Sequence, residues 1–107
     1  MTIVTLPVPK DEVVDIIKKI AKADDGRLAL SEHCIQRMLE RDILQRQVIN
    51  CIRQGNPVRG PDWDTNIESG WKVTFERVCA GQAINVGVKL LERETDFVLV
   101  LTTFDRS

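Results

Sequence analysis

The chain has 107 residues, enough for one hydrophobic core and too few for two, so we expect a single domain over residues 1–107. Hydrophobic residues make up 43% and charged residues 29%, which excludes a disordered or fibrous protein. The formal net charge of −1 excludes a protein that coats long nucleic acids through its overall charge.

The sequence carries no sign of a membrane segment, a cofactor or a metal site. No stretch approaches the roughly 20 apolar residues of a membrane span, and the first residues lack a basic segment followed by an apolar run. We therefore expect a cytoplasmic protein. The three cysteines, Cys34, Cys51 and Cys79, are an odd number without CxxC spacing, so we expect buried free thiols rather than disulfides or a zinc site.

The first predicted helix covers residues 9–24. It opens with Pro9 and early acidic residues, closes with lysines, and is ended by Asp25 and Gly26. Its apolar positions follow helical spacing: Val13, Ile16, Ile17 and Ile20. We interpret residues 1–26 as an N-terminal helical extension, and residues 27–30 as a short extended entry to the next element.

Two further helices are predicted over residues 31–41 and 42–54. Ser31 is a good N-cap for the first, and Gly55 a stop for the second. The expected inward residues are Cys34, Ile35, Met38 and Leu39 in the first helix, and Ile43, Val48, Ile49 and Ile52 in the second. We expect these two helices to form a hairpin.

After Pro57 the pattern changes to the alternation that is typical of strands. Residues 71–79 and 83–91 alternate clearly, residues 96–104 are apolar on both faces as in a central strand, and residues 58–63 are a further strand or extended loop. The predicted fold is α+β, with N-terminal helices followed by a four-stranded antiparallel sheet.

One helical turn separates each of His33, Arg37 and Arg41, and the three border the apolar stripe of their helix. Residues 27–59 hold six Lys/Arg and three Asp/Glu, so this part of the chain is locally basic. Arginines four residues apart repel, which favours an anionic ligand or carboxylate partners. Two interpretations stay open. The row binds an anion, or His33 forms a hydrogen bond with a neighbouring carbonyl and the arginines pair with Glu40, Asp42 or Glu76.

The stretch from "LSEHCIQRMLERDI" through "VLTTF", roughly residues 28–104, resembles a bacterial family of small domains of unknown function. In that family a His-x3-Arg-x3-Arg helix precedes a four-stranded meander, and the family looks like a relative of RelE, BrnT and MqsR type ribonuclease toxins. The resemblance implies a RelE-like fold and a toxin-like, metal-independent RNA endonuclease of a toxin–antitoxin pair. RNA and a small antitoxin protein would be its partners, with no cofactor.

The resemblance assigns roles to several residues, and strand alternation adds others. The expected catalytic residues are His33 as base or acid, Arg37 as the phosphate-neutralising group, and Glu76. The expected RNA-binding residues are Arg41, Arg59, Lys72 and Lys89. For the strand residues the alternative is a solvated face with cross-strand ion pairs.

The chain departs from related domains in having no tyrosine, whereas those domains often carry tyrosines around the sheet and near the carboxyl end. Trp63, Trp71 and Phe104 stand in this part of the chain, and the two tryptophans can stack on bases. An alternative function is therefore a non-catalytic RNA- or protein-binding module on the same fold.

Overall fold

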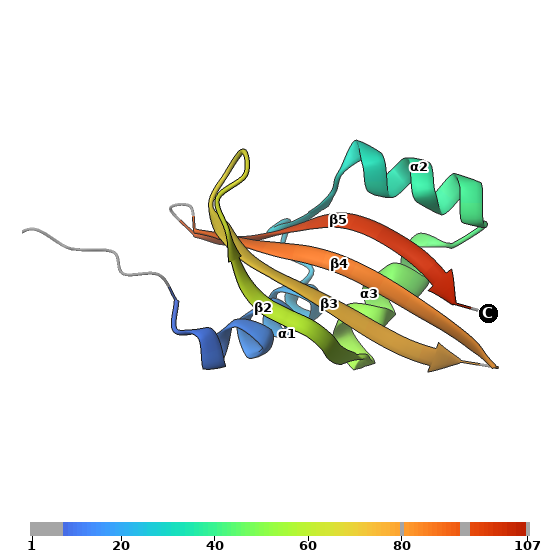
Figure 1. Cartoon of the computed structure of the whole chain (residues 1–107), viewed down its shortest axis with the longest axis horizontal. Coiled ribbons are helices and arrows are strands. Elements are labelled where there is room, and N and C mark those ends of the chain that lie inside the picture. Colours follow the sequence, from blue (N-terminus) through green and yellow to red (C-terminus); the bar gives the residue numbers. More distant parts are fainter. Residues whose placement is uncertain (1–7, 80, 93–94, 107) are drawn as a thin grey trace, which may run out of the picture.

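The computed structural model describes residues 8–79, 81–92 and 95–106. Its helices are α1 (Val13–Ala23), α2 (Glu32–Arg41) and α3 (Gln45–Gln54), and a 3-10 turn (Lys10–Glu12) precedes α1. Its strands are β1 (Leu28–Leu30), β2 (Asn56–Asp64), β3 (Gly70–Cys79), β4 (Gln82–Glu92) and β5 (Asp96–Arg106). In Figure 1, α1 and α3 lie behind the sheet, whereas α2 lies apart from them beside β5.

The sheet has five strands in the order β1-β5-β4-β3-β2. Strands β2 to β5 pair in antiparallel fashion, but β1 runs parallel to β5, with Ala29 opposite Leu99. The α+β class therefore holds, whereas the expected RelE-like, four-stranded antiparallel sheet is wrong. The fifth strand was missed because three residues are too short for an alternating pattern, and all three are half-buried.

One face of the sheet forms the hydrophobic core with α1 and α3. The alternating residues Val73 and Phe75 of β3 are buried on this face, as the sequence pattern predicted. They meet buried residues of the two helices: Val13, Ile17, Ile20, Val48, Cys51 and Ile52. Strand β5 lies between β1 and β4, which confirms that residues 96–104 form an interior strand.

A lysine joins α1 to the end of α3. The Lys18 ammonium donates hydrogen bonds to the carbonyl oxygens of Ile52 (2.9 Å), Arg53 (3.2 Å) and Gly55 (2.7 Å). The last carbonyls of a helix have no partner within the helix, so this lysine satisfies groups that the helix leaves open. In return, Arg53 Nε donates to Ala21 O at 2.7 Å. Burial lowers the pKa of Lys18.

The expected hairpin of α2 and α3 does not form. Helix α2 packs along β5, whereas α3 packs against α1, β3 and β4. Asp42 adopts a left-handed conformation (φ 55°) that ends α2, and the buried Ile43 then leads the chain away, so α3 begins only at Gln45. Of the expected apolar stripe of α2, Cys34 is buried, but Ile35 and Leu39 are 46% and 80% exposed.

Two further expectations concern the thiols and the membrane. Cys34 and Cys51 are buried and free, whereas the side chain of Cys79 lies outside the described part of the structure. None of the helices in the described ranges is long and apolar enough to cross a membrane.

Candidate functional site

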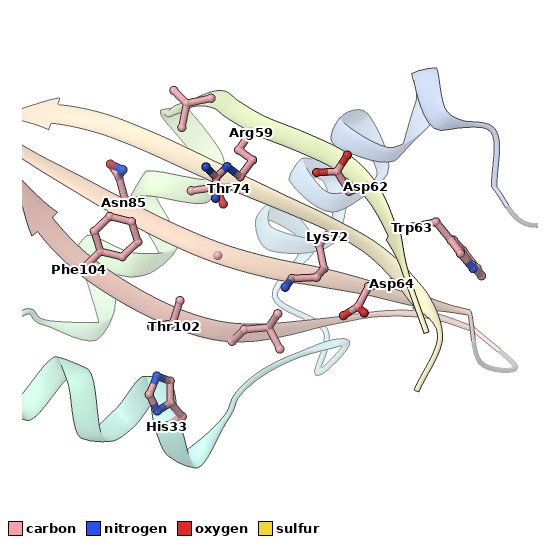
Figure 2. A pocket seen from close by; sticks show the side chains of 13 residues that line it. His33, Arg59, Asp62, Trp63, Asp64, Lys72, Thr74, Asn85, Thr102 and Phe104 are labelled. Atoms are coloured by element: carbon pink, nitrogen blue, oxygen red, sulfur yellow. The ribbon is translucent and has the colours of Figure 1, made fainter. Parts of the chain in front are cut away.

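A groove of about 900 Å³ lies on the open face of the sheet, opposite α1 and α3. Its residues on β3 and β4 alternate along the chain with the buried residues of the core face, so the two sets point to opposite sides of the sheet. The start of α2 borders the groove beyond β5 (Figure 2). The lining residues with polar or aromatic side chains are His33, Arg59, Asp62, Trp63, Asp64, Lys72, Thr74, Asn85, Thr102 and Phe104.

Two glycines shape the groove. Gly87 lies on its floor, where a Cβ atom would come within 3.2 Å of Thr102 Cγ2 and would begin to fill the space. Gly60 has φ 84°, and a Cβ there would collide with the Lys72 carbonyl oxygen. A glycine is therefore required for β2 to approach β3 this closely, next to Arg59.

Ser31 fixes the position of His33. The Ser31 hydroxyl accepts a hydrogen bond from the Cys34 amide (3.0 Å), which confirms the predicted N-cap of α2. The same hydroxyl donates to Leu101 O (2.9 Å), and the Ser31 amide donates to Val100 O (2.9 Å). The first turn of α2 is thus attached to β5, and His33, two residues after the cap, is held over the groove.

The groove brings together three nitrogen-bearing side chains from distant parts of the sequence. Figure 2 shows His33 approaching from α2, Arg59 from β2 on the opposite side, and Lys72 from β3 between them. Arg59 and Lys72 form no ion pair with the described residues. Lys72 nevertheless interacts electrostatically with Asp64, which lines the groove together with Asp62. An anion in the groove would therefore meet two cations whose charge these carboxylates partly offset.

Asp64 lines the groove and pairs with the buried Lys89. Lys89 is only 4% exposed, and its ammonium donates to Asp64 Oδ2 (3.2 Å) and to Asn66 O (2.9 Å). The Asn66 amide, which donates to Asp64 Oδ1, and the Lys89 ammonium lower the pKa of Asp64. Lys89 was expected to bind RNA from an exposed face, but its side chain is buried and holds the turn after β2 in place.

The His and Arg row does not converge. Arg37 lies outside the groove and pairs with Glu40 at 3.0 Å on the surface of α2, as the alternative reading anticipated. Arg41 is exposed at the end of the helix and does not line the groove either. Glu76 is half-buried on β3 opposite Asn85, beyond the lining residues. Of the seven expected site residues, only His33, Arg59 and Lys72 therefore share the groove.

Sequence reasoning missed Asn85, Thr102 and Phe104, which line the end of the groove away from Trp63 (Figure 2). Asn85 was detectable, because it is the one polar residue in the apolar run 83–88. Thr102 and Phe104 were not, since the sequence does not reveal that β5 carries an extra residue opposite Gly87 and Val88.

The side chains of the groove favour acid–base and anion chemistry. Histidine can transfer protons near neutral pH, and lysine and arginine hold phosphate oxygens. A thiol nucleophile does not fit, because burial raises the pKa of Cys34, next to His33, to about 11. Within the described residues, no three His, Cys, Asp or Glu side chains gather closely enough to hold a metal ion together.

The fold and the groove define a small α+β domain with a polar groove on the open face of its sheet. Residues 30–105 match the model of a domain of unknown function, DUF4258, and the chain belongs to this family. No curated protein and no solved structure matches the chain. The match begins just before α2 and ends in β5, so it includes every residue of the groove and leaves out α1. The expected membership of a family of unknown function is thereby confirmed.

Proposed function

We propose that the chain is a toxin-like endoribonuclease that cleaves single-stranded RNA in the groove without a metal ion. The observation that carries this proposal is the presence of one imidazole and two cations, from His33, Arg59 and Lys72, around a single open groove. Single-stranded RNA offers a phosphate for the cations and a ribose hydroxyl for the imidazole. The toxin-like character comes from the sequence resemblance alone, since the five-stranded mixed sheet differs from the expected RelE-like one.

In the proposed reaction, His33 removes the proton from a ribose 2′-hydroxyl. The 2′-oxygen attacks the adjacent phosphorus, the bond from phosphorus to the 5′-oxygen breaks, and the leaving oxygen takes a proton from water. Arg59 and Lys72 hold the phosphate and stabilise the negative charge that grows on its oxygens. The products are a 2′,3′-cyclic phosphate and a 5′-hydroxyl end.

The position of Arg37 changes the roles that the sequence pattern assigned. Its side chain is 41% exposed and pairs with Glu40 outside the groove, so we assign phosphate binding to Arg59 and Lys72. An exposed pair of this kind contributes little to stability, so removing Arg37 should disturb neither the fold nor the groove.

The activity is tested with end-labelled single-stranded RNA in the presence of EDTA. We expect cleavage, with 2′,3′-cyclic phosphate and 5′-hydroxyl ends identified by mass spectrometry. An RNA of the same sequence with 2′-O-methyl groups is the matched control and should stay intact, because it lacks the attacking hydroxyl. Cleavage of the methylated RNA, or cleavage only after a metal is added, would contradict the proposal.

We also propose that a small antitoxin protein restrains the activity. Ile35 and Leu39, one turn apart on α2, expose apolar surface that a partner can bind, on a side of the helix that points away from His33. Co-expression with the product of the adjacent reading frame tests this. We expect a stable complex that does not cleave RNA, and Leu39→Glu should weaken that complex without changing the activity of the free chain.

A non-catalytic module that binds RNA or protein is the second candidate. Two observations favour it: Asp62 and Asp64 lie in the same groove as the cations, and the chain has no tyrosine to assist proton transfer. The two candidates differ in one result. A silent module would bind RNA, or a partner protein, in a titration, and would leave bound RNA intact over long incubation.

A further inference from the structure

We propose that a second polar pocket, on the side of the sheet that carries α3, binds a phosphate group. The pocket has a volume of about 100 Å³ and lies between the start of α3 and the strands β3 and β4 (Figure 1). The residues that line it are Arg46, Gln47 and Asn50 of α3, Arg77 of β3 and Ile84 of β4. None of them lines the groove, so the inference is independent of the proposed ribonuclease activity.

Arg77 occupies a strand position where the pattern predicts an apolar residue. Along β3, Val73 and Phe75 are buried against the helices, and alternation places Arg77 on that same side of the sheet. Its partner on β4 is the buried Ile84. Arg77 is itself half-buried, and shielding a charged side chain from water costs free energy unless an opposite charge compensates. An arginine at this position therefore favours an anionic partner.

The pocket supplies positive charge and no negative charge. Arg46, in the first turn of α3, contributes a second guanidinium, and no acidic residue lines the pocket. Among the side chains that the structure describes, none forms an ion pair with either arginine. The groove differs in this respect, because Asp62 and Asp64 partly offset its cations. Two cations around a small pocket without a carboxylate provide a site for an anion.

Two amides complete the set of donors. Asn50 follows Arg46 by one helical turn, so both side chains lie on the same side of α3. The Oε1 atom of Gln47 already accepts a hydrogen bond from the Leu44 amide at 2.7 Å, which leaves its NH₂ group to donate to a ligand. A phosphate group presents several acceptor oxygens in different directions, whereas a carboxylate presents two in one plane. Donors from α3 and β3 together therefore fit phosphate better than carboxylate.

The size and charge of the pocket also fit a phosphate group. Its volume equals that of roughly three molecules of liquid water, which accommodates a phosphate and excludes a nucleobase with its ribose. A phosphate monoester carries a charge of about −1.5 to −2 at neutral pH, close to the combined charge of two arginines. The phosphate group can come from a small ligand or from the backbone of RNA.

The pocket is tested by titrating the protein with inorganic phosphate and following the Nε–H signals of Arg46 and Arg77 by NMR, with potassium chloride of equal ionic strength as the blank. We expect both signals to shift and to saturate at millimolar phosphate. Arg77→Met should weaken the binding that Arg46 reports about tenfold or more, because hydrogen bonds to a charged group are lost. Arg46→Met, at an exposed position, gives a second variant if Arg77→Met does not fold. Lys72→Met, which removes a cation of the groove, is the matched control and should leave the shifts unchanged.

A second titration, with 2′-O-methylated RNA, separates the two sources of phosphate. Shifts of the same two signals by RNA would assign the pocket to the backbone of a bound strand, and shifts by inorganic phosphate alone would assign it to a small ligand; both results support a phosphate site. Shifts no larger than those in potassium chloride would overturn it. Unweakened binding in Arg77→Met and Arg46→Met, or loss of the shifts in Lys72→Met, would overturn it as well. RNA cleavage by the same preparation tests the ribonuclease separately.

Discussion

The salt dependence of RNA binding measures how many cations meet the phosphates. For single strands, each phosphate that a protein cation neutralises contributes about −0.7 to the slope of log affinity against log salt concentration. The groove holds two Lys/Arg side chains, Arg59 and Lys72. We therefore expect a slope of about −1.4, which is a sevenfold loss of affinity between roughly 50 and 200 mM salt.

Lys72→Met should halve that slope to about −0.7, whereas Arg37→Met should leave it unchanged because Arg37 lies outside the groove. Fluorescence anisotropy with a labelled, 2′-O-methylated RNA measures binding without cleavage. A wild-type slope of about −3 or steeper would mean that surface cations bind the RNA as well. If Arg37→Met reduces the slope and Lys72→Met does not, the assignment of RNA binding to the groove is refuted.

Three further predictions concern the stability of the fold and its dependence on pH. Lys18→Met should lower the free energy of unfolding by about 2 kcal/mol and the Tm by about 8 °C, since three carbonyls at the end of α3 lose a charged donor. An equal loss of stability in the exposed Lys19→Met control would contradict this prediction. Ser31→Ala should cost about 1 kcal/mol in urea unfolding and slow RNA cleavage, because the cap orients His33; unchanged cleavage would separate the cap from the site. Asp64 has a lowered pKa in the folded state, so the unfolded chain takes up its proton first as the pH falls. The stability difference between wild type and Asp64→Asn should therefore be fully present above pH 3.8, the ordinary pKa of the carboxyl group. It should decline as the pH falls through the lowered pKa of the folded state. A stability difference that stays constant with pH would contradict this prediction.

Much of the fold could be predicted because its elements are amphipathic. Helical spacing in α1 and α3 and alternation in β3 indicate burial on one side, and the buried residues follow those patterns. Strand β4 departs from its alternation, because Asn85 and Lys89 on its groove face are buried as well. The placement of α2 could not be predicted in this way. Its four apolar residues favour a helix packed on the core, yet Leu39 is exposed because α2 lies at the edge of the sheet, along β5.

The candidate site was predictable only in part, for a geometric reason. Spacing within one helix places Arg37 next to His33, but it does not reveal which side of the helix meets the sheet. The cations that share the groove with His33 come from β2 and β3, at positions that depend on strand register and on the bulges around Gly60. The bulges shift the register of β2 against β3 at Arg59, and the alternation of a single strand does not reveal such shifts.

The burial of Lys89 illustrates the same limit. Its place in the alternation puts it on the groove face, opposite Lys72, where an exposed cation was expected. The turn that follows β2 covers it, and Asp64 and Asn66 O take its hydrogen bonds. The residues that accept these hydrogen bonds lie 23 to 25 positions earlier in the chain. Strand alternation does not predict contacts over that distance.

The central claim is that His33 acts in the groove and that Arg37, one turn away, does not. The most direct test compares single-turnover RNA cleavage by His33→Ala and Arg37→Met, with circular dichroism to verify that both variants fold. We predict that His33→Ala slows cleavage about 100-fold or more, as expected for the loss of a general base, and that Arg37→Met cleaves at the wild-type rate. Full activity in His33→Ala, or an equal loss in both variants, would contradict the account.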